Sequence, residues 1–406
     1  MTRRAALDEL AVVGGTPVRT SAMPPWPSYD EEEIAAAGEV LASGRVNYWT
    51  GGEGRAFEEE FAAYHHLPYA IALSNGTVAL EVAIEALRLG PGDDVIVPPR
   101  TFVATISSVA RSGARPVFAD VEPIGGNLTA ETIAAALTPE TRAIVVVHLG
   151  GWPADMPAIA ALAEERGLEI IEDCAQAHGA KVAGRLVGTF GSVGCFSMCQ
   201  DKIITTAGEG GMVVTSRPDL WDAMWSLKDH GKNHDLVYAE HPPGFRWLHT
   251  GFGTNGRLTE SQAAIGRIQL RRLATMVATR RRNAAILDAA VELQPALRMA
   301  APAEGVEPSY YKYYTHVRRD RLASGWDRDR IMAAINAEGV PCFVGSCSEV
   351  YLEAAFAEEL RPPRRLPVAR QLGETSLMFL VHPTLTEGDM GDAAAAVAKV
   401  MAHATG

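Results

Sequence analysis

Short apolar runs alternate with stretches of helical period over the first 270 or so residues. Several of the runs are apolar throughout, as expected when helices cover both faces of a parallel sheet. The intervening stretches are amphipathic, for example Thr77–Leu89, which stops at Gly90-Pro91. This order predicts an α/β domain on a mainly parallel sheet. The predicted strands are Ala70–Leu73, Val95–Val97, Pro116–Phe118, Ala143–Leu149, Leu168–Glu172, Cys195–Ser197 and Gly211–Thr215.

The pattern changes beyond about residue 270. A long helical stretch, Arg271–Leu293, is followed by a predicted strand, Tyr313–Val317, and by two helices, Arg328–Glu338 and Glu387–Ala404. The first 30 residues are too rich in proline for a regular element. We therefore expect an N-terminal arm (1–30), a large three-layer α/β domain (31–270) and a smaller C-terminal α/β domain (271–406).

Composition and charge narrow the class of protein. The 406 residues are 47% apolar and 21% charged, which is typical of a globular chain. With 37 Lys and Arg against 49 Asp and Glu, the formal net charge is −12. The chain has no run of basic residues that would indicate a nucleic-acid or membrane partner. No window reaches the ~18 apolar residues of a membrane span, and the start lacks a secretory apolar region. We expect a cytoplasmic protein.

Cysteine and histidine spacings give no metal signature. The five cysteines are scattered, and Cys195 and Cys199 lie four apart with no second ligand pair nearby. The eleven histidines include no H-E-x-x-H spacing. The sequence therefore predicts no metal site.

Three loops at the ends of predicted strands carry candidate chemistry. Ser74–Thr77 joins a strand to a helix, Glu172–Gln176 places an acid after a buried strand, and Ser197–Gly211 holds Lys202 before a glycine-rich return. A helix N-terminus binds anions, and the carboxyl ends of parallel strands face the ligand crevice. Taken singly, each loop has a plainer interpretation: a helix cap, a solvated acid and a surface lysine.

Together the loops carry what pyridoxal phosphate requires. The cofactor needs an amine for its aldehyde, a carboxylate for its ring nitrogen and a cradle for its phosphate. Lys202 would supply the amine and Asp173 the carboxylate, which keeps the ring nitrogen protonated so that the ring accepts electrons. Lys202 would also move the substrate's Cα proton as general base and acid. We predict that these two residues are catalytic.

Five segments of the chain have a specific pattern when they are taken jointly: Ser74–Leu80, Thr101–Thr105, Glu172–Gly179, Phe196–Gly211, and Gly253–Arg257 with Glu260–Ala264. In these segments the chain resembles the DegT–StrS family of sugar aminotransferases, which are pyridoxal-phosphate enzymes of fold type I. The resemblance runs from about Pro24 to the C-terminus. It implies an enzyme whose large domain binds the cofactor.

The resemblance also implies roles for particular residues. Asn255 would reach the phosphate from the neighbouring subunit, which implies a homodimer with shared active sites. Phe102 could instead be plain core, Arg257 could be an ion-pair partner, and His178 is expected to pack behind the site. The implied contacts are Gly76, Thr77 and Ser197 with the phosphate, Phe102 on the ring face, Asp173 with the ring nitrogen, Gln176 near the ring hydroxyl and Lys202 as the Schiff base.

Two details concern the reaction. Family members that dehydrate sugars carry histidine where this chain has Lys202, so the lysine favours amino transfer. The family's usual Ser-Phe-His before the lysine is Ser197-Met198-Cys199 here, which alters the pocket wall. The expected donor is glutamate or glutamine. The expected acceptor is a nucleoside-diphosphate-linked keto-deoxyhexose, with 4-keto-6-deoxy preferred over 3-keto, in amino-sugar and antibiotic biosynthesis.

The substrate side leaves alternatives open. Tyr48 and Trp49 in the run Asn47–Thr50, and Tyr313 in the run Tyr310–Tyr314, are candidates because aromatic and amide groups suit a sugar and a base. Interface packing is an equal alternative for these residues. An aminotransferase for a keto-cyclitol or for the aminobenzoate pathway is the close rival. A non-catalytic regulator that binds pyridoxal phosphate is ranked lower, because the acidic chain has no DNA-binding appendage.

Overall fold

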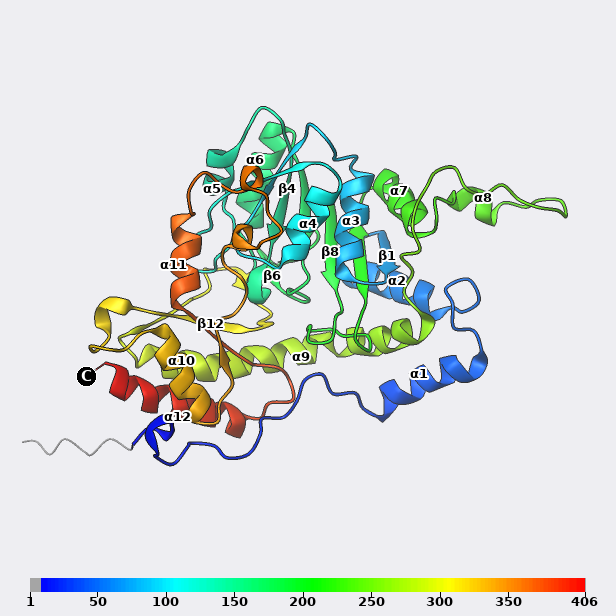
Figure 1. Ribbon diagram of the computed structural model, residues 1–406. Coiled ribbons are helices and arrows are strands. Elements are labelled where there is room, and N and C mark those ends of the chain that lie inside the picture. The colour runs from blue at the N-terminus through cyan, green and yellow to red at the C-terminus, as the bar shows by residue number, and fades with distance from the viewer. Residues whose placement is uncertain (1–8, 406) are drawn as a thin grey trace, which may run out of the picture.

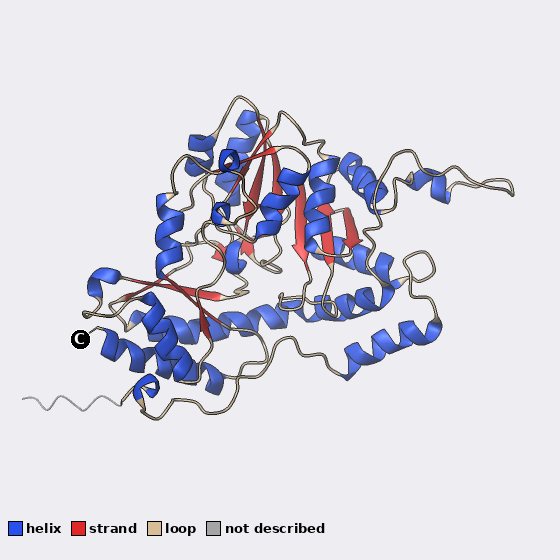
Figure 2. Ribbon diagram, viewed as in Figure 1, coloured by secondary structure: helices blue, strands red, loops and turns tan. Residues whose placement is uncertain are grey.

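The computed structural model describes residues 9–405, and it is built around a seven-stranded sheet (Figures 1 and 2). The strand order is β1-β9-β8-β5-β4-β2-β3. Strand β9 pairs antiparallel with both neighbours, and all other pairs are parallel. The strands are β1 (Tyr69–Leu73), β2 (Asp94–Val97), β3 (Arg115–Phe118), β4 (Thr141–Val147), β5 (Glu169–Asp173), β8 (Val193–Ser197) and β9 (Gly211–Thr215). The predicted α/β class with a mainly parallel sheet is confirmed.

Helices cover both faces of this sheet and make three layers. Successive strand residues point to opposite faces, so Val95 and Val97 pack in one apolar cluster and Ile96 in another. The first cluster contains α3 (Gly76–Ala86), α4 (Val103–Arg111) and α7 (Pro218–Lys228). The second contains α5 (Ala130–Ala136) and α6 (Met156–Arg166). A third cluster joins β1 and β8 to α2 (Glu53–Tyr64) and α9 (Glu260–Glu292).

Local signals explain several helix ends. The Asn75 side chain accepts a hydrogen bond from the Val78 amide and so caps α3. Asp155 caps α6, and Gly167 ends it in the left-handed conformation with φ of 65°, as the sequence predicts. Helix α9 begins at Glu260 and not at the predicted Arg271, because Thr259 and Gln262 form a capping box.

The C-terminal region has its own core. Its four-stranded antiparallel sheet has the order β10-β12-β14-β13, with β10 (Leu297–Met299), β12 (Tyr313–Val317), β13 (Cys342–Phe343) and β14 (Ser376–Phe379). Helices α10 (Arg328–Ala337) and α12 (Glu387–Ala404) pack with the C-terminal half of α9 around this sheet, and α11 is Pro367–Thr375 (Figure 1). A small sheet, β11-β6-β7, joins Val306–Glu307 to Lys181–Val182 and Arg185–Leu186. Short 3-10 turns occupy Leu149–Gly151, Arg319–Arg321, Val350–Leu352 and Glu358–Leu360.

Helix α9 runs without interruption along both regions (Figure 1). Its N-terminal half packs on α1 (Glu31–Ser43) and α2, and its C-terminal half packs on α12. The helix therefore crosses residue 270, where the sequence places the border between the two domains. That border stays a prediction.

Two further segments lie outside the layers. The described part of the N-terminal arm holds one 3-10 turn, Ala11–Val13, before α1, and residues 1–8 lie outside the described chain. Residues 230–254, here called the projecting segment, extend away from the body and contain α8 (His234–Tyr238) (Figure 1). The Trp247 and Phe252 side chains on this segment are 82% and 99% exposed. Between residues 9 and 405, no helix has the length and apolarity to cross a bilayer.

Candidate active site

A cavity of about 1010 Å³ opens where the carboxyl ends of β4, β5 and β8 meet the first turns of α3 and α4. The C-terminal region closes its other side with Tyr311, Lys312 and Tyr314 and with the Phe343–Cys347 loop. The cavity brings together seven residues that the sequence predicts as cofactor contacts: Gly76, Thr77, Phe102, Asp173, Gln176, Ser197 and Lys202. They come from four separate stretches of chain, so the fold and not the local sequence assembles them.

Lys202 lies in the loop that follows β8. Its backbone is fixed on two sides, because its amide donates to the Cys199 carbonyl at 3.1 Å and its carbonyl accepts from Trp26 Nε1 at 2.9 Å. The ammonium nitrogen lies 4.8 Å from the centroid of the Tyr311 ring. The side chain therefore reaches the cavity from a rigid base.

Asp173 ends β5 and is 5% exposed. Its carboxylate accepts from Thr105 Oγ1 at 2.7 Å and from the Ala175 amide at 3.1 Å. Burial raises the pKa of Asp173, and these two hydrogen bonds and the Lys202 charge oppose the rise. Sequence reasoning missed Thr105, although it sits one turn after Thr101 in a segment that carries the resemblance. Its hydroxyl fixes one oxygen of the acid.

The start of α3 forms a cradle next to Ser197. The first amide groups of a helix have no partner within the helix, so they can bind an anion. A Cβ on Gly76 would lie 2.6 Å from Ser197 Cβ, and a Cβ on Gly211 would lie 2.3 Å from the Asn75 carbonyl oxygen. Only glycine fits at these two positions. The backbone can thus close on a small group, as a phosphate site requires.

Gln176 and Phe102 complete the walls. The Gln176 side chain accepts from the Gly150 amide at 2.7 Å, which fixes its orientation at the cavity. Phe102 is 67% exposed, although it is a large aromatic residue, and it lines the cavity. A flat ring bound in the cavity would cover this apolar face.

The residues present fit pyridoxal phosphate. An accessible lysine, a buried and oriented carboxylate, an uncovered aromatic ring and a helix start that tolerates no Cβ line one cavity. The cofactor needs an amine, an acid and a phosphate cradle, and the three groups face the same space.

Four predicted residues lie outside this cavity. The backbone of Asn255 forms an isolated antiparallel β-bridge with Asp229 at the base of the projecting segment. Tyr48 is buried, and its hydroxyl donates to Glu58 at 3.0 Å. The Trp49 ring lies edge-on to Trp225, at 6.1 Å between centroids. Asn255, Tyr48 and Trp49 keep their roles as predictions only.

Tyr313, which the sequence predicts on the substrate side, does not line this cavity. It is 2% exposed, sits in the C-terminal core, and its hydroxyl donates to Asp288 at 2.8 Å. Because side chains alternate along β12, Lys312 and Tyr314 point the other way and line the cavity. The structure therefore brings Tyr311, Lys312 and Tyr314 to the site and leaves Tyr313 in the core.

Two buried groups near the site are structural. Glu172, next to Asp173, accepts from the amides of Gly188, Phe190 and Gly191 and faces His148 Nε2 at 3.2 Å. Its oxygens are thus occupied, although His148, Glu172 and Cys174 lie close enough to suggest a metal cluster. His178 is buried against Phe196, and burial lowers its pKa to about 3.

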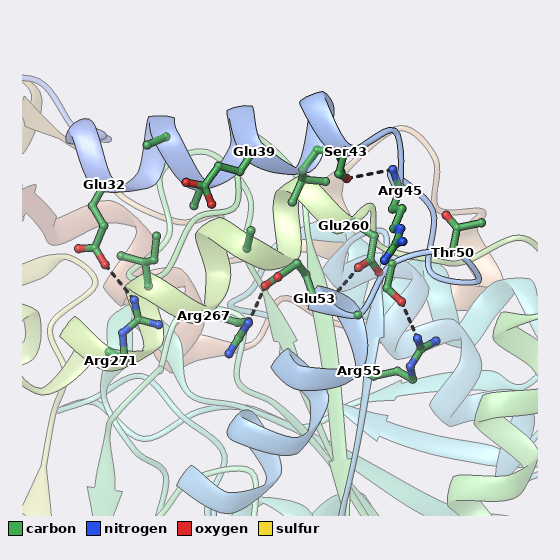
Figure 3. Close-up of a pocket in the computed structure, with 17 residues that line it drawn as sticks. Glu32, Glu39, Ser43, Arg45, Thr50, Glu53, Arg55, Glu260, Arg267 and Arg271 are labelled. Atoms are coloured by element: carbon green, nitrogen blue, oxygen red, sulfur yellow. Dashed lines mark hydrogen bonds and ion pairs between the residues drawn. The ribbon is translucent and has the colours of Figure 1, made fainter.

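A second hollow, of about 850 Å³, lies between α1, α2 and α9 (Figure 3). Its charged side chains are largely paired: Arg267 contacts Glu53 and Glu60, and Arg271 contacts Glu32. The Glu260 carboxylate accepts from the Glu53 and Gly54 amides. None of the residues predicted for catalysis or cofactor binding lines it.

Known proteins resemble this chain over nearly its whole length. The model of the DegT/DnrJ/EryC1/StrS aminotransferase family matches residues 27–398. L-glutamine:2-deoxy-scyllo-inosose aminotransferase of Streptomyces kanamyceticus is 38% identical and covers 97% of each chain. The dTDP-3-amino-3,4,6-trideoxy-alpha-D-glucose transaminase of Streptomyces venezuelae is 35% identical over 88% of this chain and 90% of its own. An aminotransferase structure from Psychrobacter cryohalolentis superposes with a TM-score of 0.92 at 54% identity, over 94% of this chain and 99% of its own.

Proposed function

Because the chain belongs to the DegT/DnrJ/EryC1/StrS aminotransferase family and is a pyridoxal-phosphate-dependent aminotransferase, we propose that it aminates a keto-sugar. The proposed acceptor is a nucleoside-diphosphate-linked 4-keto-6-deoxyhexose of the dTDP type, and the proposed donor is L-glutamate. The product would be an amino sugar carried on the nucleotide.

The side chains of the cavity have distinct proposed tasks. When bound, pyridoxal phosphate supplies an electron sink for the bond broken at the substrate Cα. The start of α3 and the Ser197 hydroxyl bind the phosphate, and Phe102 covers one ring face. Asp173, oriented by Thr105, holds the proton on the ring nitrogen. Lys202 binds the cofactor and moves the proton at the substrate Cα.

The size and make-up of the cavity support a large acceptor. Its volume of about 1010 Å³ is just above the roughly 300–1,000 Å³ usual for small-molecule sites, so room remains beside the cofactor. The C-terminal region adds Tyr314 and the Phe343–Cys347 loop, which offer an aromatic face, hydroxyls and backbone groups. This free volume beside Lys202 is the observation that carries the proposal.

We propose that the working unit is a homodimer. Asn255 lies outside the cavity of its own chain, and the projecting segment exposes Phe245, Trp247 and Phe252, which are 79%, 82% and 99% exposed. A second copy would cover these rings and bring its Asn255 to the phosphate. Mixing inactive Lys202→Ala and Asn255→Ala proteins would then restore part of the activity, because one site of each mixed dimer is intact. No recovery after confirmed exchange of subunits would contradict shared sites.

A keto-cyclitol is the second candidate acceptor. The S. kanamyceticus relative is named for one, and the acids Asp173, Asp201, Glu209 and Glu353 outnumber the cations Lys202 and Lys312 on the cavity wall. An acidic wall suits a neutral polyol better than a diphosphate.

One assay separates the candidates. The pyridoxamine form of the enzyme is offered a panel of 4-keto and 3-keto sugar nucleotides and keto-cyclitols, and the return of the pyridoxal absorption is followed. Turnover of a dTDP-linked 4-keto-6-deoxyhexose, with competition by thymidine diphosphate, would support the proposal. Turnover of a cyclitol alone, with no effect of any nucleoside diphosphate, would refute it and support the second candidate.

A further inference from the structure

Besides Lys202, one other cation lines the cavity within the described chain, and neither the catalytic scheme nor the cofactor uses it. This is Lys312, at the edge of β12. Its side chain is 14% exposed, and its ammonium nitrogen lies 3.3 Å from Asp201 Oδ2. A lysine placed on a cavity wall and largely withdrawn from water is costly unless it meets anions, so the group it serves is of interest.

The surroundings hold the Lys312 ammonium close to the reacting end of the cavity. Both ammonium groups lie near the Tyr311 ring, with Lys312 Nζ 4.6 Å and Lys202 Nζ 4.8 Å from its centroid. The Tyr311 hydroxyl donates to Asp201 Oδ2 at 2.5 Å, the same oxygen that faces Lys312. Asp201 directly precedes Lys202, so one carboxylate fixes Tyr311 and Lys312 against the loop that carries Lys202.

The Lys312 ammonium has hydrogen-bonding capacity left for a further anion. Lys202 and Lys312 both lie near the Tyr311 ring, and only Asp201 forms an ion pair with Lys312 among the described residues. An ammonium has three hydrogen-bond donors, and Asp201 takes one of them. Burial lowers the pKa of Lys312, and the Asp201 charge opposes this, so an incoming carboxylate would favour the charged lysine further.

We propose that Lys312 binds the α-carboxylate of the amino-acid donor and so selects α-amino acids in the first half of the reaction. The inference rests on the proposed amino-acid donor and is independent of the identity of the acceptor. Every donor of the glutamate or glutamine type carries an α-carboxylate next to the amine that must reach Lys202. Lys312 places its ammonium on the wall beside Lys202, where that carboxylate would lie.

Asp201 and Tyr311 act as positioning residues in this arrangement. Although burial favours the neutral acid, the hydrogen bond from Tyr311 and the charges of both lysines together lower the pKa of Asp201. The carboxylate thus stays ionised and keeps the Lys312 side chain from swinging away.

The test uses the holoenzyme and the donor half-reaction alone, so that no acceptor is needed. Lys312→Met, with Lys312→Arg as the matched variant that keeps the charge, is mixed with L-glutamate or L-glutamine while the visible absorption of the bound cofactor is followed. We expect Lys312→Met to raise the apparent Kd for both donors by about 10- to 100-fold, the size of a lost charge-assisted hydrogen bond. Lys312→Arg should recover a large part of this loss.

A substrate without the carboxylate identifies the group that Lys312 meets. L-glutamine is compared with 4-aminobutanamide, which is the same molecule without the α-carboxylate. In the wild type, glutamine should bind more tightly by about 10- to 100-fold, and in Lys312→Met this preference should shrink to a few-fold. Cofactor affinity and the visible absorption before donor addition should match the wild type in both variants, which shows that the site is folded.

Three results would overturn the inference. An unchanged Kd for both donors in Lys312→Met would do so, and so would an equal loss for 4-aminobutanamide and glutamine. A loss with glutamate and none with glutamine would also count against it, because Lys312 would then bind the side-chain carboxylate. If wild-type enzyme failed to react with any α-amino acid, the proposed donor class and not Lys312 would be wrong.

Discussion

Two lysines with similar partners occupy two different regions of the molecule. Lys202 lies on the cavity wall, 4.8 Å from the Tyr311 ring, with Asp173 in the same cavity. Lys228 ends α7 and is fully buried, 3.7 Å from the Tyr48 ring and 4.0 Å from Glu58 Oε1. Both have an aromatic face and a carboxylate nearby, but only Lys202 lines the active-site cavity.

The difference shows that a perturbed lysine is not by itself a reactive lysine. Burial lowers the pKa of Lys228 and raises the pKa of Glu58, so this pair has the marks often used to find functional sites. Yet Tyr48, Trp225 and Glu58 surround Lys228, and it does not line the active-site cavity. Access for a flat ring distinguishes the Lys202 site from the Lys228 site.

The strongest way to break this comparison is to remove each amine. Lys202→Ala should lose at least about 10³-fold in turnover, because the same side chain binds the cofactor and moves the proton. Lys228→Met should retain most turnover per folded molecule. Single-turnover rates with L-glutamate, together with the visible spectrum of bound cofactor, check both. Full turnover in Lys202→Ala would end the assignment.

The second test concerns stability. Among the described residues, Lys228 is the only cation within 4.0 Å of Glu58 Oε1, and Lys228→Ala removes it. The Glu58 carboxyl group then keeps only its hydrogen bonds from the Tyr48 hydroxyl and the Ala72 amide. We expect the free energy of unfolding to fall by about 3–5 kcal/mol. Urea denaturation of the holoenzyme measures this. The double variant Lys228→Met with Glu58→Gln should recover part of the lost free energy of unfolding. A greater loss in the double variant would contradict the idea that the two buried charges stabilise each other.

The third test asks whether the Asp173 carboxylate is needed for turnover while the Glu58 carboxylate is not. Asp173→Asn keeps the shape and the contact with Thr105 but removes the charge. Turnover should fall by about 10²–10³-fold, in the range seen when one oriented electrostatic partner is lost. Glu58→Gln is the matched control, with little change in turnover. A loss of the same size in Glu58→Gln would remove the distinction between the two acids.

The last test concerns pH, and its effect on stability is the smallest when it is taken per pH unit. Burial lowers the pKa of His178 to about 3, below its usual 6.5, so the folded protein resists protonation of this ring while the unfolded chain accepts it. Stability from this group is therefore complete above pH 6.5 and is lost as the pH falls from there towards 3, by about 1.4 kcal/mol per pH unit. His178→Leu should flatten the fall in denaturation midpoint between pH 6.5 and 4. An unchanged slope would assign the acid sensitivity to other buried groups.

Much of the large sheet could be read from the sequence because its strands are apolar on both faces. The ends of β1, β2, β3, β5 and β9 fall within a residue of the predicted bounds. The antiparallel direction of β9 could not be predicted, since direction depends on pairing and not on composition. Strands of two residues, such as β6 and β7, are too short to show any period.

The candidate site divides in the same way. The loops that carry Asp173 and Lys202 were chosen from the sequence because chain order places the ends of parallel strands at one edge of the sheet. The roles of Phe102, Gln176 and Ser197 came from the resemblance to the family. The run Tyr310–Tyr314 has no polar alternation, so its phase could not be read, and Tyr313 was chosen where Lys312 and Tyr314 face the cavity. Thr105 and Asp201 act only through contacts made in three dimensions.

The uninterrupted helix α9 has a mechanical consequence. At about 1.5 Å per residue its 33 residues make a rod of about 50 Å, so a tilt of about 5° would carry its far end by about 4 Å. Arg280, in the middle of the rod, donates to the carbonyl groups of Tyr310 and Tyr311. Any tilt of helix α9 would therefore change the distance between Tyr311 and the Lys202 loop. The two regions that the helix connects would move together and not independently.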